Sequence, residues 1–124
     1  VLLNCGWTEA LEPKTLEPLI PHLPSIDLIL LTHADVKHLG SLPYVLTKYA
    51  LTCPVVCTEP VGRLGELACV ACLEDREKYR APVAELEVDD VLRVFMARLT
   101  QLNYRETHTA QAQGRAVSVC ALPA

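Results

Sequence analysis

The sequence lacks the features that mark several large classes of protein. It has no cluster of lysine and arginine and a formal net charge of −4, which argues against a free-standing nucleic-acid binder, because neutralising phosphates needs clustered basic residues. No apolar run approaches the roughly 20 residues of a membrane helix, and no signal peptide is recognisable. A phosphate-binding glycine loop, a nucleophile paired with a base, and internal repeats are absent as well.

What the chain does contain is typical of a folded domain. Of its 124 residues, 51% are hydrophobic and 21% are charged, a balance that favours one globular core over disorder. The chain opens on apolar residues at Val1 without an initiator methionine, and residues 120–124 form no polar tail. We therefore expect a piece of a longer protein, truncated at both ends.

Six cysteines lie in apolar surroundings, at positions 5, 53, 57, 69, 72 and 120. Without a signal sequence, buried reduced thiols are a better interpretation than disulfides. Cys69 and Cys72 form a C-x-x-C pair, which would suit a redox or zinc site. The pair falls within a predicted helix and has no second pair, so we interpret it as structural.

The first half of the chain alternates strand-like and helix-like stretches. Apolar runs predict strands at residues 1–5, 26–32 and 54–57, and the second of these is apolar on both faces, as in a sheet covered on two sides. Residues 13–23 have helical spacing but several prolines, which predict a short or kinked helix. Residues 39–51 repeat apolar side chains as a one-faced helix does.

The second half begins with a long predicted helix over residues 58–80, with Thr58 as its N-cap. The charged stretch 76–87 is expected to be a loop or mobile insertion. Asp89 or Asp90 would cap a further helix over 91–100, and a strand pair is predicted at 102–107 and 116–122, joined by a turn over 109–114. This order predicts an α/β fold with helices packed on a mixed sheet.

The segment 28–40 is the most informative part of the sequence. An apolar strand leads directly into His33, Asp35, Lys37 and His38, and Gly40 with a helical pattern follows. Two imidazoles and a carboxylate could bind a metal, although catalytic zinc needs about three protein ligands and Lys37 would repel a cation. The alternative is that the histidines hold the corner between strand and helix by hydrogen bonds. His22 and His108, with no partner nearby in sequence, are interpreted as surface histidines.

Three stretches resemble one family: Leu3-Asn4-Cys5-Gly6-Trp7, residues 26–35 and residues 38–44. They are similar to the β-CASP branch of the metallo-β-lactamase proteins, and most similar to its non-catalytic members in the pre-mRNA 3′-end cleavage and polyadenylation machinery. The resemblance implies part of an αββα sandwich, with residues 1–124 as the N-terminal part of a metallo-β-lactamase-like domain. The β-CASP domain and the C-terminal region would lie beyond Ala124.

The chain departs from the active members of that family, whose motif is H-x-H-x-D-H. His33 and His38 match the first and last histidines, whereas Asp35 stands in place of the middle histidine and Lys37 in place of the aspartate. Asn4 replaces an aspartate that supports the metal-side loop. The resemblance therefore implies vestigial motif positions, no catalytic residue and no cofactor, with weak or residual zinc as the alternative.

The function implied by the resemblance is that of a pseudo-nuclease: a nuclear scaffold that pairs with the catalytic endonuclease subunit and a symplekin-like partner, and meets pre-mRNA indirectly. Two alternatives remain open. One is an active metal-dependent hydrolase or nuclease that uses His33, Asp35 and His38 as unusual ligands. The other is an interaction domain of the same fold without a role in RNA processing.

Overall fold

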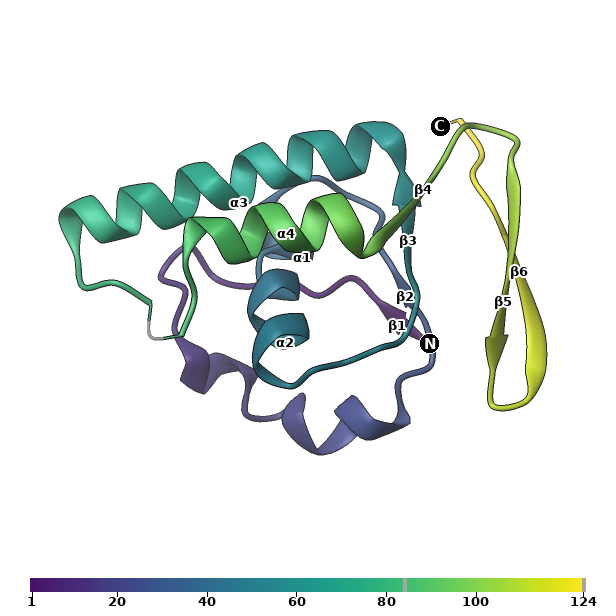
Figure 1. Cartoon of the computed structure of the whole chain (residues 1–124), viewed down its shortest axis with the longest axis horizontal. Helices are drawn as coiled ribbons and strands as arrows, with labels where there is room; N and C mark the ends of the chain where they lie inside the picture. The colour runs from purple at the N-terminus through teal and green to yellow at the C-terminus, as the bar shows by residue number, and fades with distance from the viewer. Residues whose placement is uncertain (84, 124) are drawn as a thin grey trace.

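The computed structural model describes residues 1–83 and 85–123. Its central sheet has four parallel strands in the order β1-β2-β3-β4. They are β1 (Leu2–Leu3), β2 (Ile29–Leu30), β3 (Val55–Thr58) and β4 (Leu99–Leu102). The helices are α1 (Val36–Leu39), α2 (Leu42–Lys48), α3 (Glu59–Tyr79) and α4 (Val88–Ala97), with 3-10 turns η1 (Pro13–Leu16) and η2 (Ile20–Ser25) (Figure 1). The α/β class and the three early strands are confirmed. The mixed sheet is not, because every described pair in the main sheet is parallel.

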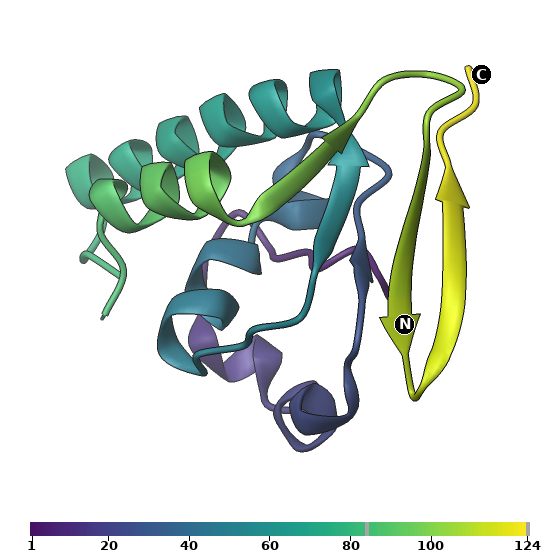
Figure 2. The same cartoon turned by 45° about the vertical axis from the view of Figure 1, so that its right-hand side comes forward.

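Alternate residues of the strands face two different cores. Ile29, Leu31 and Val55 belong to the large core under the helices, whereas Leu28 and Val56 belong to a smaller core on the opposite face. A hairpin of β5 (Thr107–Ala112) and β6 (Arg115–Cys120) covers that second face (Figure 2). The predicted coverage of the sheet on two sides is therefore confirmed, and the hairpin is what covers the second side.

The hairpin corrects the predicted strand pair at 102–107 and 116–122. Gln113 and Gly114 both have positive φ, 50° and 72°, which is the backbone of a tight two-residue hairpin turn. The turn is therefore shorter than residues 109–114, and Thr107 to Ala112 are free to pair with Arg115 to Cys120. His108 consequently lies in strand β5, paired with Val119, and not in a loop.

The predicted helix 91–100 is shifted in the structure. Glu87 is the N-cap, and it forms a capping box with Asp90, so the predicted aspartate caps are wrong. The helix ends at Ala97 because Leu99 pairs with Val55 in the sheet. Its apolar spacing continues past this point, but parallel pairing with a strand far away in sequence decides the conformation.

Helix α3 has the predicted extent, and glycines on its buried face bring it close to α1. Gly65 is buried, and a Cβ built there would lie 2.5 Å from Cδ2 of Leu39. Leu64 and Leu67 lie on the opposite side and are 57% and 64% exposed. The long helix therefore packs through its small residues and leaves two of its leucines in solvent.

The loop predicted over 76–87 begins later, because residues 76–79 still belong to α3, and the described residues after the helix are anchored to the core. Val83 and Leu86 are buried, and Lys48 of α2 forms an ion pair with Glu85 at 2.6 Å. These contacts contradict a mobile insertion. Between Pro13 and Ser25 the chain forms η1 and η2, whose prolines account for the broken helix that the sequence predicted.

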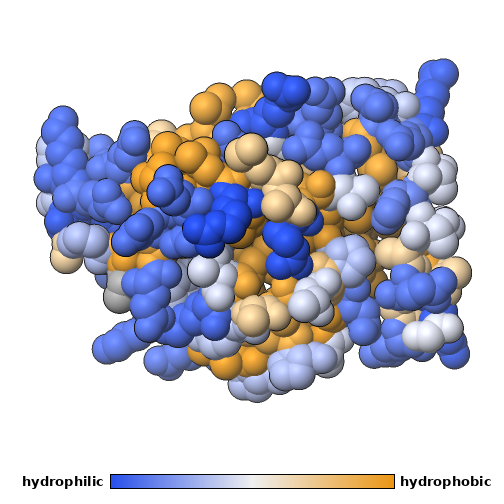
Figure 3. Space-filling model, viewed as in Figure 1, coloured by the Kyte–Doolittle hydropathy of each residue, from blue (hydrophilic) through white to orange (hydrophobic). Residues whose placement is uncertain are grey.

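Polar and apolar side chains alternate over the surface in Figure 3, with hydrophilic residues gathered over the end of α3 and the loop after it. None of the described helices is long and apolar enough to cross a membrane. The predicted truncation at both ends stays a prediction.

Candidate functional site: a polar cluster at the ends of β1 and β2

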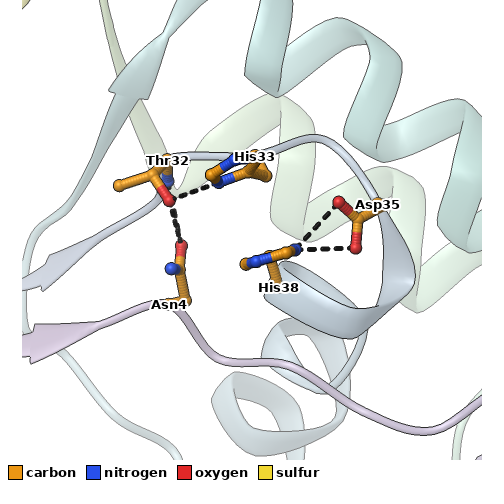
Figure 4. A network of polar contacts seen from close by, with 5 residues as sticks. All are labelled: Asn4, Thr32, His33, Asp35 and His38. Carbon is orange, nitrogen blue, oxygen red and sulfur yellow. Dashed lines mark hydrogen bonds and ion pairs between the residues drawn. The ribbon is translucent and has the colours of Figure 1, made fainter.

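The vestigial motif positions come together where two neighbouring parallel strands end. Asn4 follows β1, Thr32 and His33 follow β2, and Asp35 precedes α1, which carries His38 (Figure 4). Side chains at the carboxyl ends of adjacent parallel strands share one edge of the sheet. Asn4 lies next to the other motif positions in the structure, although it precedes His33 by 29 positions in the sequence.

Asn4 fixes the first half of the cluster. Its Oδ1 accepts hydrogen bonds from the Thr32 backbone N–H at 2.9 Å and from Thr32 Oγ1 at 3.1 Å. Because the Thr32 hydroxyl donates to Asn4, its oxygen accepts the hydrogen bond from His33 Nδ1 at 2.7 Å. The amide at position 4 therefore still supports the loop, as an acceptor that carries no charge.

Asp35 and His38 form the second half. Nδ1 of His38 donates to both carboxylate oxygens of Asp35 at 2.8 Å. This hydrogen bond is the main reason that the pKa of Asp35 is lowered. The pair is open to water, with 38% of the His38 side chain and 54% of the Asp35 side chain exposed. Asp35 thus binds the neighbouring histidine through the same oxygens that a metal would need.

The two imidazoles stack on one another. Their ring centroids are 4.2 Å apart, and the rings are inclined by 21°. Each uses Nδ1 for a hydrogen bond within the cluster, which leaves both Nε2 atoms for another partner. In metal-binding proteins, hydrogen bonds of this kind fix the tautomer and orientation of the ligating histidines.

Lys37 lies on the exposed surface of α1, beside this cluster. It lines two hollows, one shared with Asp35 and His38 and the other shared with Asn4. Its backbone carbonyl packs against Gly6, where any Cβ would overlap that oxygen. The backbone of Lys37 is therefore held against Gly6, and its ammonium group adds a positive charge to this surface, which opposes a divalent cation.

The nitrogen and oxygen atoms of this cluster do not make a catalytic zinc site by themselves. The described residues include no group of three or more His, Cys, Asp or Glu side chains placed to hold a metal. They supply two imidazole nitrogens, while the one nearby carboxylate is bound to His38. Whether the protein retains weak or residual zinc stays a prediction.

A second, buried set of contacts holds the cluster in place, and no motif in the sequence indicates it. The Cys5 N–H donates to the His38 carbonyl at 2.7 Å, and Ser41 Oγ donates to the Cys5 carbonyl at 2.9 Å. Ser41 is fully buried, next to Cys5. Thr32 was also overlooked as the link between Asn4 and His33. A hydroxyl directly before the first histidine was the available signal.

The C-x-x-C pair forms no disulfide and, among the described residues, belongs to no group placed to hold a metal. All six cysteines are free. Burial raises the pKa of Cys69 to about 12, which keeps it a protonated and unreactive thiol. Cys69 packs in the large core, so the structural interpretation is supported.

Comparison with known proteins places this geometry in a family. The family model for the metallo-beta-lactamase superfamily domain matches residues 1–124. Cleavage and polyadenylation specificity factor subunit 2 of Oryza sativa subsp. japonica is 38% identical over 121 residues, covering 95% of this chain and 16% of the relative.

Two animal proteins are similar over the whole chain. Probable cleavage and polyadenylation specificity factor subunit 2 is 36% identical in Caenorhabditis briggsae and 32% identical in Drosophila melanogaster. The alignments cover 100% of this chain but only 14% and 16% of those relatives. The sheet covered by helices on one face and a hairpin on the other, and the full-length match to the family model, together show that this chain belongs to the metallo-beta-lactamase superfamily.

Proposed function

We propose that the protein is a non-catalytic subunit of the pre-mRNA 3′-end cleavage and polyadenylation complex, where it serves as a scaffold for the catalytic endonuclease subunit. The observation that carries the proposal is the Asp35–His38 pair. At the position where active enzymes place a ligand histidine, this chain has a carboxylate whose two oxygens both bind His38. The similarity to cleavage and polyadenylation specificity factor subunit 2 supports the choice of complex.

Charge also favours a scaffold over a nuclease. Lys37 and Asn4 replace acidic residues of the active motif, so the cluster has lost anionic groups that would hold a cation. The net charge of −4 and the lack of a lysine and arginine cluster argue against direct RNA binding by these residues. Contact with pre-mRNA would therefore be indirect, through the endonuclease subunit or a symplekin-like partner in the nucleus.

One observation favours the rival function, a metal-dependent hydrolase with unusual ligands. Both histidines hold Nδ1 in hydrogen bonds and keep Nε2 available, as ligating histidines do. Ligands from other parts of a longer chain would be needed to complete such a site. Metal content and RNA cleavage therefore separate the two functions.

Affinity purification of the tagged full-length protein from its own cells tests the proposal. We expect the endonuclease subunit and the symplekin-like protein to co-purify in near-stoichiometric amounts, and we expect His33→Ala to leave this recovery unchanged, because a scaffold does not need the cluster for chemistry. Recovery without any polyadenylation factor would contradict the assigned complex.

A repaired motif provides the second test. We expect the double variant Asp35→His and Lys37→Asp to show no metal-dependent RNA cleavage, because one loop supplies only part of an active site. Cleavage by the unaltered protein that is abolished by His38→Ala would favour the rival function.

A further inference from the structure

A groove runs between α1 and α3 beside the polar cluster. It is open, with a volume of about 870 Å³, and its floor is formed by small side chains of Ala34, Ala68, Ala71 and Cys72. Leu64 and Leu67 continue this surface along α3, because residues three, four and seven positions apart share one face of a helix. Both leucines are more than half exposed, so an apolar strip extends beyond the groove itself.

Three carboxylates line the same groove: Glu9, Asp35 and Asp75. Lys37 is the one lysine in the lining, and it leaves an excess of negative charge. None of the ion pairs among residues 1–83 and 85–123 involves Glu9 or Asp75. Neither carboxylate is therefore held in an ion pair within the described part of the chain.

Cys72 reports the field inside the groove. Burial raises the pKa of its thiol, Glu9 and Asp75 raise it further, and Arg76 opposes them. Glu9 and Asp75 come from different segments of the chain and both lie near Cys72, whose thiol contacts the Glu9 carbonyl at 3.9 Å. An apolar strip edged by unpaired carboxylates disfavours a phosphate chain and matches a cationic, partly apolar segment.

We propose that the groove between α1 and α3 docks a segment of a partner protein that carries apolar side chains next to lysine or arginine. The apolar side chains lie on the small-residue floor and against Leu64 and Leu67, and the basic groups meet Glu9 and Asp75. The docking surface rests on the lining of the groove alone, so it does not depend on the identity of the complex proposed above.

Alkylation of Cys72 in the full-length protein, followed by mass spectrometry, tests this surface. The probe is a synthetic amphipathic peptide of leucine, alanine and arginine. Its controls are the same peptide with glutamate in place of arginine, and a single-stranded oligouridine. We expect the basic peptide alone to slow alkylation of Cys72 several-fold, while Cys120, exposed on the hairpin, keeps its rate.

Two neighbouring carboxylates on α3 give a matched pair of variants. Asp75 lines the groove and Glu74 does not, although both are exposed. We expect Asp75→Lys to weaken binding of the basic peptide about five- to tenfold, since one attraction becomes a repulsion, and Glu74→Lys to change it little. Each variant is compared with its own alkylation rate without peptide.

The proposal is overturned if the basic peptide gives no protection, if the glutamate peptide protects equally, or if the two lysine variants behave alike. Protection by oligouridine would instead identify the groove as a path for RNA.

Discussion

Asn4 combines a backbone conformation with a hydrogen-bonding pattern that few residues can supply together. Its φ is 64°, a left-handed conformation that asparagine tolerates better than most side chains. In this conformation its Oδ1 receives both donors of Thr32. The substitution that removes a negative charge from the motif therefore keeps the geometry of the loop.

We expect Asn4→Ala to lower the free energy of unfolding by about 1–2 kcal/mol, through the lost acceptor and the strained φ. Asn4→Gly relieves the strain but not the lost acceptor, so it falls between Asn4→Ala and the unaltered protein. Asn4→Asp retains the acceptor and stays within about 0.5 kcal/mol. Urea unfolding measures all three, and equal stability of Asn4→Ala and the unaltered protein would refute this role.

The contribution of Asp35 to the stability of the fold depends on pH. The hydrogen bond from His38 lowers the pKa of this carboxyl below its ordinary value of 3.8. A group whose pKa is lower in the folded state adds stability above its unfolded pKa, and this contribution is lost as the pH falls through the folded pKa. The loss therefore occurs in acid, at and below about pH 3.8.

A titration followed by the carboxyl-carbon NMR shift checks the cause. We expect the midpoint of Asp35 to lie below 3.8 and to return toward that value in His38→Ala, with a much smaller change in His33→Ala. If the midpoint of Asp35 is the same in His38→Ala as in the unaltered protein, the hydrogen bond from His38 does not lower the pKa of Asp35.

Most residues of this cluster can be predicted from the sequence, but the hydrogen bonds that join them cannot. The rule that parallel strands end at one edge brings Asn4 near His33 without any coordinates. The role of the Thr32 hydroxyl could not be predicted, because its partner Asn4 is 28 residues away in the sequence.

At the scale of the elements, small residues set the distance between α3 and its neighbours. Gly62 and Gly65 are both buried in α3, yet they face different surroundings. A Cβ at Gly65 would meet Leu39, which is fully buried, whereas a Cβ at Gly62 would meet the side chain of Gln101, which is exposed and can move.

This contrast predicts opposite outcomes for the same substitution. Gly62→Ala gains helix propensity of about 1 kcal/mol at little steric cost, whereas Gly65→Ala forces apart a packed interface, which typically costs about 1–3 kcal/mol. We expect Gly65→Ala to be the less stable of the two variants by about 1–3 kcal/mol in chemical unfolding. Equal stability would mean that Leu39 has room to move.

Local sequence patterns predict a helix or strand correctly where its packing agrees with its intrinsic propensity. They fail where pairing with a strand far away in the sequence determines the conformation. The helix predicted over 58–80 is nearly right in its bounds, because Thr58 occupies the N-cap position and Pro60 lies in the first turn, although Thr58 makes no side-chain capping hydrogen bond. Leu99 continues the spacing of α4 but joins β4, because Val55 offers it a strand partner. A single sequence contains no local signal for that partner.

The whole molecule has two cores separated by one sheet, and its edge at β1 is poorly covered. Leu3 is 66% exposed, on the face that the hairpin shields farther along the sheet. An edge strand with an exposed leucine can pair with another chain. Strands that are apolar on both sides predict that the second face of the sheet is covered. They do not predict which element covers it, because no local sequence pattern indicates that β5 and β6 pack against Leu28 and Val56.

We expect residues 1–124, produced alone, to self-associate through this edge and to unfold without a sharp transition. Leu3→Lys should reduce the association in sedimentation velocity, because a charge at an edge opposes pairing. Met96→Lys is the control: it places the same charge on α4, at a side chain that is 82% exposed. We expect it to leave the self-association unchanged. A monomeric unaltered chain with a sharp thermal transition would contradict the expectation.

The metal content of the full-length protein, measured by elemental analysis after dialysis at neutral pH, is the most direct test of whether this loop has lost its metal. Asn4, Thr32, His33, Asp35 and His38 form a polar cluster held by hydrogen bonds among themselves, at the motif positions that the family resemblance assigns to zinc ligands in active enzymes. We predict a substoichiometric amount of transition metal that His33→Ala leaves unchanged. A stoichiometric metal that is lost in His33→Ala would contradict it and would favour an active metal-dependent hydrolase.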